Sequence, residues 1–514
     1  HRVDPLLDPL PDVELAARRD QVQRHVLDSA DHLVDDRRLE ALGHERQRPQ
    51  RAEHLVDLSL DQAPRARPGE GGVDLVSAEE LGATTGRAAL PTPAASDTAF
   101  IQYTSGSTRF PRGVVIEQCA VMSNLAGIIR HGVRIGPGDR CFSWLPFYHD
   151  MGLVGLVLVP VASQVSVDYL DTREFAMRPR QWLNLMTQTK ATISFGPPFG
   201  YELCTRRLRP GEATKYDLSN WRVAGVGAEM IRSETLTRFA QALKPAGFNE
   251  NAFLACYGMA ECSLAVSFAP LNAGLDIDFI DGDYLSDERR ALPVNADAPQ
   301  STVRSSRFVN CGIPLPEYEV EIRDAHGRRL PERHVGTIYV KAASLMSGYF
   351  GDIKLTREVL SADGWFNTGD LGYMVKNGLF ITGREKDMII INGRNIWPQD
   401  LEYLAEQQPE VNISDALAFS VPGPEDEEVC VLVVQCRDSD SDVRADLIDR
   451  LKRLVHLELG IDTYVELVPS HTLPRTSSGK LSRSKARQQF IERHDPVQLV
   501  PATAVSGKPA GVVE

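Results

Sequence analysis

The first 72 residues differ sharply in composition from the rest of this 514-residue chain. Between His1 and Gly72 there is no Ile, Lys, Thr, Asn, Phe, Trp, Tyr, Met or Cys. A segment without aromatic residues or isoleucine has little apolar volume to bury, so we predict no packed core there. Two interpretations stay open: a poorly ordered N-terminal extension, and a non-native stretch translated in another reading frame. In either case the fold must be built by later residues, and we place no functional residue in 1–72.

The overall composition is that of an ordinary globular protein, 42% hydrophobic and 25% charged. A net charge of −14 argues against a general binder of nucleic acid or of anionic membranes. No apolar run approaches 18 residues, so we expect no stable membrane insertion. The eight cysteines include no Cys-x-x-Cys pair and predict reduced thiols in a cytoplasmic protein.

From Val73 onward the pattern is mixed α/β. Short apolar runs predict buried strands at Ala191–Phe195 and Arg222–Gly225. Helical periodicity follows in Ser233–Leu243, with Ser233 as the expected N-cap. One face of that helix carries the apolar residues Leu236, Phe239, Ala240 and Leu243.

A smaller unit is predicted near the C-terminus. Strands are expected at Ala416–Val421 and Val429–Gln435, on either side of a charged loop. A helix over Val443–Leu459 should end at Gly460. Residues 496–514 form a Pro/Ala/Gly-rich tail that we expect to be disordered.

The chemistry begins where an apolar strand leads into Tyr103-Thr-Ser-Gly-Ser-Thr-Arg-Phe-Pro-Arg-Gly113. Backbone N–H groups and hydroxyls in such a loop can be aimed at phosphate oxygens. The loop lacks the GxxxxGK[ST] pattern of a Walker A motif. As bare composition, a cluster of Ser, Thr and Gly is more often a solvated turn than a phosphate site.

Further motifs appear downstream in a fixed order, and together they resemble the adenylate-forming superfamily of acyl-CoA synthetases, luciferases and adenylation domains. They are Gly227-Ala-Glu229, Cys256-Tyr-Gly-Met-Ala-Glu261, Trp365-Phe-Asn-Thr-Gly-Asp370, Gly383-Arg-Glu-Lys-Asp387 and Pro474-Arg-Thr-Ser-Ser-Gly-Lys480. Ordered motifs spread over so much of the chain are far more specific than one short glycine-rich motif. The resemblance covers about residues 73–495.

Within this superfamily, other segments resemble the fatty acyl-AMP ligases. They are Ser143-Trp-Leu-Pro-Phe-Tyr-His-Asp-Met-Gly-Leu153, Phe195-Gly-Pro-Pro-Phe-Gly-Tyr-Glu-Leu203 and Lys386-Asp-Met-Ile-Ile-Ile-Asn-Gly-Arg-Asn-Ile-Trp-Pro-Gln-Asp400. Those enzymes carry an insertion after the Tyr-Gly-x-Ala-Glu motif that disfavours coenzyme A chemistry. The long polar stretch Ser267–Arg307 is consistent with such an insertion.

The resemblance implies an α/β adenylate-forming fold. A large AMP-binding domain is expected over 73–386, shortened at its front relative to the family. A small, mobile α+β domain is expected over 387–495, turning about a hinge at Lys386 and carrying Lys480.

The resemblance also implies an ATP site. The phosphates would contact Thr104, Ser105, Gly106, Ser107, Thr108 and Arg112. Adenine and ribose would contact Gly227, Ala228, Glu229, Tyr257, Gly258, Asp370 and Arg384. A carboxylate such as Asp370 can accept hydrogen bonds from both ribose hydroxyls. Glu261 and Thr104 would hold Mg²⁺, which prefers oxygen ligands.

Lys480 is the main expected catalytic residue, together with Glu261, Thr104 and His149. A fatty carboxylate must approach an anionic α-phosphate, and a lysine placed between them offsets the repulsion. The acyl chain is expected to contact His149, Phe195, Gly196, Phe199 and Tyr201.

Some positions depart from the family pattern. Arg109 stands where the family has Gly, Arg112 where it has Lys, and Gln118 where many relatives have His. If position 109 needs a positive φ, a side chain there costs on the order of 1–3 kcal/mol. These departures and the short front keep one alternative open, a non-catalytic relative that binds nucleotide or an acyl chain.

The expected reaction is ATP- and Mg²⁺-dependent formation of a fatty acyl-adenylate with release of pyrophosphate. The acyl group would pass to an acyl carrier protein or to a carrier domain of a polyketide or nonribosomal peptide synthetase. The main alternative is a fatty acyl-CoA ligase. The cluster Arg206, Arg207 and Arg209 is one candidate surface for an acidic carrier protein, against a solvated face.

Overall fold

The computed structural model describes residues 92–104, 111–294, 304–391, 393–423, 427–476 and 479–494. Every described residue belongs to one compact unit, Pro91–Glu514. Several predictions lie outside the described residues. They concern the segment 1–72, Ser105, Gly106, Ser107, Thr108, Arg109 and the tail 496–514.

A seven-stranded sheet forms the centre of the large α/β region, with the strand order β11-β8-β7-β6-β5-β3-β4. Strands β4, β3, β5, β6 and β7 run parallel, whereas β8 pairs antiparallel with β7, and β11 pairs antiparallel with β8. Their bounds are β3 Arg140–Ser143, β4 Ser166–Tyr169, β5 Ile193–Gly196, β6 Val223–Val226, β7 Phe253–Gly258, β8 Ala265–Phe268 and β11 Ile313–Pro314. The predicted strands at 191–195 and 222–225 are therefore confirmed as β5 and β6.

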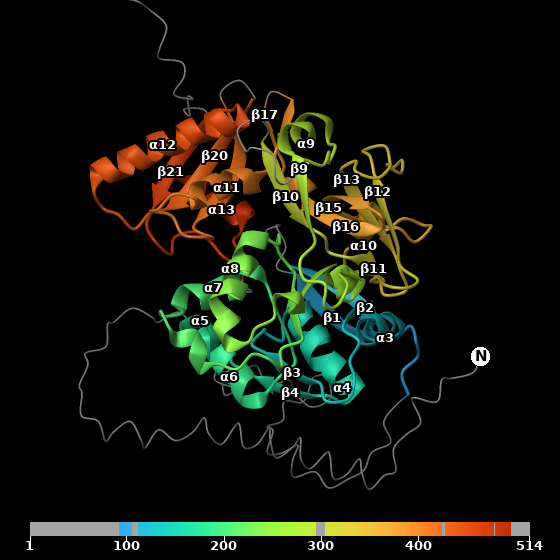
Figure 1. Cartoon of the computed structure of the whole chain (residues 1–514). Coiled ribbons are helices and arrows are strands. Elements are labelled where there is room, and N and C mark those ends of the chain that lie inside the picture. Colours follow the sequence, from blue (N-terminus) through green and yellow to red (C-terminus); the bar gives the residue numbers. More distant parts are fainter. Residues whose placement is uncertain are drawn as a thin grey trace, which may run out of the picture. The chain divides into compact units, whose positions relative to one another are not determined.

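Helices follow the parallel strands, as the βα alternation predicts (Figure 1). They are α5 Thr172–Met177, α6 Arg180–Thr189, α7 Pro198–Arg207 and α8 Ser233–Leu243. The predicted apolar face of α8 is buried. The capping prediction was wrong, because Ser233 is the first residue of the helix and Arg232 occupies the N-cap position without a side-chain cap.

Two π-helical segments contact the same sheet. The segment η4, Ile128–Gly132, continues helix α3, Gln118–Gly127, and contacts β8. The segment η5, Met151–Leu158, leads into α4, Val159–Ser163, and contacts β3. Such widened helical turns are uncommon and are often found at functional sites.

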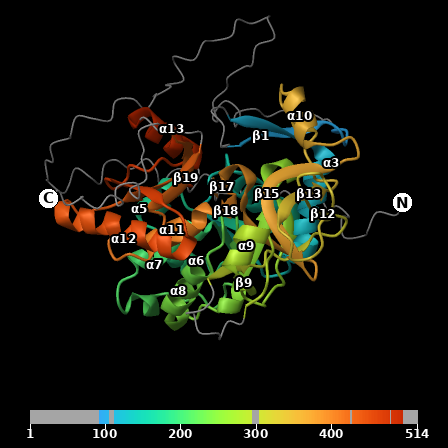
Figure 2. The ribbon, with the colours of Figure 1, turned by 90° about the horizontal axis from the view of Figure 1, so that it is seen from above.

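Two smaller sheets complete the large region. A three-stranded sheet joins β1, Thr98–Thr104, and β2, Arg112–Glu117, to β14, Gly348–Tyr349. Helix α10, Ile353–Val359, lies beside this sheet (Figure 2). A four-stranded sheet contains β12 Glu319–Arg323, β13 Gly336–Lys341, β15 Phe366–Val375 and β16 Gly378–Arg384.

The stretch predicted as an insertion, Ser267–Arg307, contains regular structure of its own. Strand β9, Ile277–Asp281, pairs antiparallel with β10, Ser305–Val309, and helix α9, Gly282–Glu288, follows β9. Ile280 and Leu285 from this stretch share a hydrophobic cluster with Trp397.

The C-terminal region has separate hydrophobic clusters on a three-stranded sheet of β19, β20 and β21. Helix α12 packs along β21 (Figure 1). The bounds are β17 Ile389–Ile391, β18 Arg394–Ile396, α11 Pro398–Glu406, β19 Ala416–Pro422, β20 Glu428–Gln435, α12 Ser441–Leu459, β21 Thr463–Val468 and α13 Arg483–Arg493. The predicted strands and helix are confirmed, and Gly460 ends α12 with a left-handed φ of 67°. Among the described residues no helix is both long and apolar enough to cross a bilayer.

Candidate active site

A cavity of about 810 Å³ lies at the carboxyl ends of the parallel strands. In open α/β sheets, ligands bind at this edge. Predicted site residues from widely separated segments line it together. They are Thr104, Arg112, His149, Phe195, Phe199, Ala228, Glu229, Tyr257, Gly258, Glu261, Asp370, Arg384, Lys386 and Lys480.

The carboxylate of Asp370, in the middle of β15, is held from two sides. Tyr257, on β7, donates a hydrogen bond from its hydroxyl to Asp370 Oδ2 at 2.8 Å. Arg384, at the end of β16, donates from Nε to the other oxygen at 3.1 Å. Burial and the neighbouring Asp370 charge raise the pKa of Tyr257 well above its usual range, so its hydroxyl keeps its proton. This network fixes a carboxylate at the cavity wall.

The carboxylate of Glu261 lies where β7 has ended and a short 3₁₀ turn begins. Its Oε1 accepts a hydrogen bond of 2.9 Å from the Tyr349 hydroxyl. The Arg112 guanidinium lies 5.6 Å from the centre of the Tyr349 ring. Burial raises the pKa of Glu261. Glu261 and Thr104 both line the cavity and carry oxygen atoms, the ligand type that Mg²⁺ prefers.

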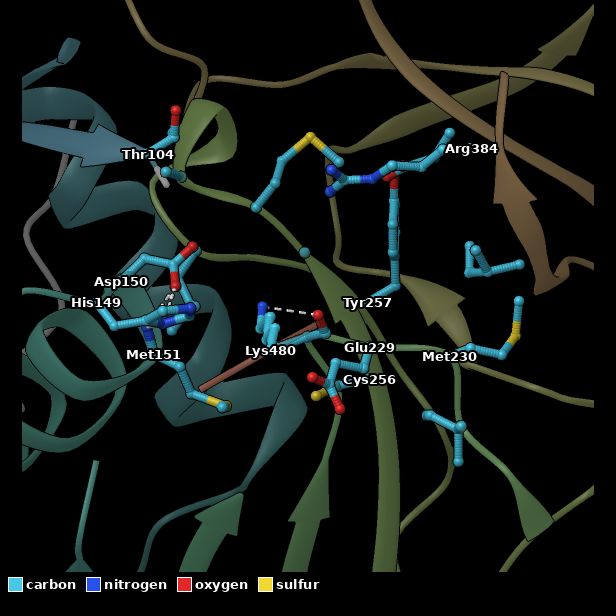
Figure 3. Close-up of a pocket in the computed structure, with 18 of the residues that line it drawn as sticks. Thr104, His149, Asp150, Met151, Glu229, Met230, Cys256, Tyr257, Arg384 and Lys480 are labelled. Carbon is cyan, nitrogen blue, oxygen red and sulfur yellow. Dashed lines mark hydrogen bonds and ion pairs between the residues drawn. The ribbon is translucent and has the colours of Figure 1, made fainter. Parts of the chain in front are cut away.

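Lys480 reaches the site from the C-terminal region. Its ammonium group donates a hydrogen bond of 2.8 Å to the carbonyl of Ala228 (Figure 3). Ala228 has a left-handed φ of 67°, a backbone conformation that is uncommon for residues other than glycine. Burial lowers the pKa of Lys480, although the carboxylates of Glu229 and Asp150 act in the opposite direction.

His149 and Asp150 form a pair at the start of η5. The His149 Nδ1 atom lies 2.6 Å from Asp150 Oδ1, and this oxygen also accepts the backbone N–H of Met151 at 2.7 Å. Burial alone would raise the pKa of Asp150, but His149 and Lys480 together hold it below its usual value. His149, Asp150 and Lys480 all point into the cavity (Figure 3).

Glu229 adds a further carboxylate beside Lys480 in the cavity (Figure 3). Burial raises the pKa of Glu229, although the positive charges of Lys480 and Arg475 act against this effect. Lysine, histidine and carboxylates therefore lie together in a partly dehydrated place. Such perturbed groups in a cleft are typical of catalytic sites.

The deep part of the cavity is apolar. Phe195 projects from β5, and a β-carbon on Gly225 of the next strand would lie only 2.0 Å from its ring. Only glycine at 225 leaves room for that ring. The remaining walls come from both π-helical segments and the sheet: Ile128, Val133, Cys141, Gly155, Leu264 and Phe268. This part suits a hydrocarbon chain.

Among the predicted site residues that the structure describes, three do not line the cavity. Tyr201 is fully buried and donates its hydroxyl hydrogen bond to the Gly225 carbonyl at 2.8 Å. A β-carbon on Gly196 would lie 3.1 Å from the Trp144 ring, so this glycine makes room for an aromatic side chain. A β-carbon on Gly227 would lie 2.8 Å from the carbonyl oxygen of Cys256, so this glycine allows close packing on β7.

The structure also brings in residues that the sequence analysis did not single out. Asp150 pairs with His149, Tyr349 bonds Glu261, and Cys141 and Phe268 line the deep part of the cavity. A signal existed for Asp150, because it directly follows His149 in the segment that resembles fatty acyl-AMP ligases. Tyr349 and Phe268 gave no such signal, since aromatic residues near strands are normally core.

Comparison with known proteins places the chain in a family. The AMP-binding enzyme family matches residues 13–350. A protein of Caulobacter vibrioides (strain NA1000 / CB15N), provisionally named an acyl-CoA synthetase, is 47% identical over 79% of this chain and 70% of its own length. The medium-chain-fatty-acid–[acyl-carrier-protein] ligase JamA of Moorena producens (strain JHB) is 33% identical over 77% of this chain and 68% of its own length.

Solved structures agree with this placement. A structure from a study of fatty acyl-adenylate ligases of E. coli and L. pneumophila has a TM-score of 0.74 and 48% identity, covering 79% of this chain and 72% of that one. An L. pneumophila fatty acyl-adenylate ligase in complex with acyl adenylate and pyrophosphate has a TM-score of 0.57 and 32% identity, covering 78% and 71%. The chain therefore belongs to the AMP-binding enzyme family, as one of the fatty acyl-AMP ligases of the adenylate-forming superfamily.

Proposed function

We propose that this chain joins a fatty acid to AMP with release of pyrophosphate, and passes the acyl group to the phosphopantetheine thiol of a carrier protein. One observation carries this proposal. The Lys480 ammonium reaches the Ala228 carbonyl inside a cavity that also contains the Tyr257–Asp370–Arg384 network and a deep apolar channel. The Tyr257–Asp370–Arg384 network suits a nucleotide, the Lys480 ammonium suits a carboxylate, and the apolar channel suits a hydrocarbon chain.

The nucleotide would occupy the polar half of the cavity. Asp370 would accept hydrogen bonds from the ribose hydroxyls, with Tyr257 and Arg384 holding its carboxylate in place. Adenine would lie against Ala228, Glu229 and Tyr257. Arg112 and the loop Ser105–Thr108 would hold the phosphates.

The bond-forming step follows from this arrangement. A carboxylate oxygen of the fatty acid attacks the α-phosphorus of ATP, and the bond to the pyrophosphate oxygen breaks in line with it. Both reactants are anionic, so the Lys480 ammonium lowers the repulsion and stabilises the added negative charge. The His149–Asp150 pair would border the carboxylate end of the acyl chain, and Phe195 and Phe199 would border its hydrocarbon part.

Magnesium would be held by Glu261 and Thr104, together with phosphate oxygens and water. The described residues contain no cluster of three or more His, Cys, Asp or Glu side chains suited to a metal. Mg²⁺ commonly needs only one or two protein ligands and keeps several waters, so a lone carboxylate with a hydroxyl fits it. When bound, the ion would offset charge on the departing pyrophosphate.

The acceptor is proposed from the insertion. The Asn395 side chain on β18 donates a 2.9 Å hydrogen bond to the Ser286 carbonyl of α9, and Arg394 pairs with Asp287 at 2.8 Å. The insertion therefore contacts the region that would turn about the hinge at Lys386. Since such an insertion disfavours coenzyme A chemistry in fatty acyl-AMP ligases, this contact supports a carrier protein as the acyl acceptor over coenzyme A. The relative JamA, named for transfer to acyl carrier protein, supports the same choice.

Arg206 and Arg207 are exposed in the last turn of α7, with Arg209 close behind, and offer an acidic carrier protein a basic surface. A cytoplasmic location is proposed as well. It is supported by eight free cysteines, which suit a reducing compartment.

A second candidate, fatty acyl-CoA ligase, is favoured by the name of the Caulobacter relative. Both candidates share adenylation and differ in the acceptor. The test incubates the full chain with ATP, Mg²⁺ and fatty acids of graded length, and detects acyl-adenylate by mass spectrometry. Holo-acyl carrier protein and coenzyme A are then added in parallel reactions. The proposal predicts acyl-carrier protein as the main product. Acyl-CoA formed at an equal or higher rate would favour the second candidate, and a folded chain that forms no adenylate would contradict both.

A further inference from the structure

Glu406, at the end of α11, is a buried carboxylate that the proposed reaction does not use. Its side chain is 2% exposed. It forms an ion pair with Arg232, which precedes α8 in the large region. Its other oxygen accepts the backbone N–H of Ser414 at 2.8 Å. A buried carboxylate must be paired in this way, because an isolated charge in the interior is costly.

The partner Ser414 is held at both ends of its peptide unit. While Glu406 accepts its N–H, its carbonyl accepts a hydrogen bond of 3.0 Å from Nη2 of Arg475. Ser414 has a left-handed φ of 62°. Such a conformation persists in a non-glycine residue only when the surroundings hold it. Here Glu406 and Arg475 hold the backbone of Ser414 in this conformation.

Arg475 continues the connection to the loop that ends at Lys480. Its Nη1 donates to the carbonyl of Gly479 at 2.9 Å. The Thr476 N–H donates to the Lys480 carbonyl at 2.8 Å, and the Lys480 N–H donates to Thr476 Oγ1 at 3.2 Å. The backbone on both sides of the Lys480 α-carbon is therefore fixed relative to Arg475.

Both ends of this chain of contacts meet the same segment of the large region. Lys480 donates a hydrogen bond to the carbonyl of Ala228, and Arg232 lies four residues further along the same segment. The C-terminal region thus contacts the segment 228–232 at two points: at Ala228 through Lys480, and at Arg232 through Glu406 and, at 3.8 Å, through Glu402. Glu406, Ser414, Arg475 and Gly479 link these two points within the C-terminal region.

We propose that Glu406 is a positioning residue for Lys480: by pairing with Arg232 and holding Ser414, it couples docking of the C-terminal region to placement of the lysine in the active site. This inference rests on the proposed adenylation function. It assigns no direct contact with substrate to Glu406. The coupling is physical, because the Glu406 charge is compensated only while Arg232 is in place.

The test uses Glu406→Gln in the full chain. Glutamine keeps an oxygen for the Ser414 N–H but removes the charge that pairs with Arg232. The matched control is Glu410→Gln, since Glu410 pairs with Arg450 at 2.8 Å and has no link to the Lys480 loop. Pyrophosphate release is measured under saturating ATP and fatty acid. Transfer from preformed acyl-adenylate to carrier protein is measured separately.

We expect Glu406→Gln to lower kcat for adenylation by about tenfold or more, with KM values nearly unchanged, because a charged buried contact is lost. The transfer half-reaction and the Glu410→Gln control should keep their rates. In a Lys480→Ala background, Glu406→Gln should cause no further loss, because Glu406 acts through Lys480. The inference would be overturned if Glu406→Gln left the adenylation rate unchanged, or if it lowered the adenylation and transfer rates equally. It would also be overturned if the losses of Glu406→Gln and Lys480→Ala were fully additive in the double variant.

A second readout does not need activity. Lys480 is acetylated with an amine-specific reagent and compared with the exposed Lys485 in the same chain by peptide mass spectrometry. Glu406→Gln should raise the relative acetylation of Lys480 by about threefold or more, since the loop opens more often. Equal labelling of both variants would overturn the inference. If the wild-type chain forms no adenylate, the proposed function fails, and this labelling alone still decides the role of Glu406.

Discussion

Lys480 donates a 2.8 Å hydrogen bond to the carbonyl of Ala228, a residue 252 positions earlier in the chain. This contact places a cation at the carboxyl ends of the parallel strands. It also uses a carbonyl whose residue has a left-handed φ of 67°. The ammonium group is therefore held by the backbone, close to where a carboxylate and a phosphate would meet.

Asp370→Asn tests the nucleotide wall. The amide cannot match the charge of the Arg384 guanidinium and accepts fewer hydrogen bonds from a ribose. We expect KM for ATP to rise about tenfold or more, and the free energy of unfolding to fall by about 1–3 kcal/mol. Steady-state kinetics and thermal unfolding check this. Asp324→Asn, at an exposed turn paired with Arg328, is the control, and an unchanged KM in Asp370→Asn would contradict the assignment.

Gly225→Ala tests the apolar channel. The added methyl group would meet the Phe195 ring, which must then move into the cavity. We expect a loss of about 1–3 kcal/mol in stability and reduced adenylation of long fatty acids relative to short ones. Adding Phe195→Ala should restore long substrates.

Tyr201→Phe is the matched control for the channel. It removes only the bond to the Gly225 carbonyl, so we expect a stability loss of about 1 kcal/mol without a change in chain-length preference. A changed preference in Tyr201→Phe with none in Gly225→Ala would show that the acyl chain lies elsewhere.

The cysteine thiols that line the cavity allow a direct test of whether a fatty acid binds there. Cys141 and Cys256 line the cavity, and burial raises the pKa of each to about 12. At pH 8 only about one in ten thousand of such thiols is ionised, so iodoacetamide should modify the exposed Cys119 first. Bound fatty acid should slow the modification of Cys141 and Cys256 but not of Cys119. Mass spectrometry follows the rate of modification of each cysteine. Equal modification rates of Cys141 and Cys256 with and without fatty acid would count against binding of the acyl chain in this channel.

Glu406 predicts a pH-dependent stability. Burial raises its pKa from 4.5 to about 7, with Arg232 lowering it and the neighbouring Glu402 charge raising it. The folded state thus binds the extra proton, so this contribution to stability is complete below pH 4.5 and is lost as pH rises through about 7. The wild-type chain should lose up to about 3 kcal/mol relative to Glu406→Gln across that range. Denaturant unfolding at pH 5 and pH 8 measures this, and a constant difference would contradict the shift.

Local patterns predicted much of the fold. The apolar spacing of α8 and α12 and the apolar runs of β5 and β6 depend on neighbours in sequence, and all four are found. The ordered motifs also predicted which distant segments share one cavity. Ser233 failed as a cap because the helix begins with it, a difference of one residue that periodicity does not resolve.

Side-chain direction was harder to predict. Phe199 and Tyr201 are two residues apart on α7, which rotates them about 200° from one another, so only Phe199 reaches the cavity. Phe195 and Gly196 are successive on β5 and face opposite sides of the sheet. The Arg232–Glu406 pair joins residues 174 positions apart, and no local pattern announces such a contact.

The most direct measurement is the fatty-acid-dependent exchange of labelled pyrophosphate into ATP, comparing the wild-type chain with Lys480→Ala. Lys485→Ala, which removes an exposed lysine of α13, is the control. Exchange should fall about 100- to 1,000-fold in Lys480→Ala, as expected when a group that stabilises transition-state charge is removed, and should persist in the control. Undiminished exchange in Lys480→Ala, or no exchange by the folded wild-type chain, would contradict adenylation at this site.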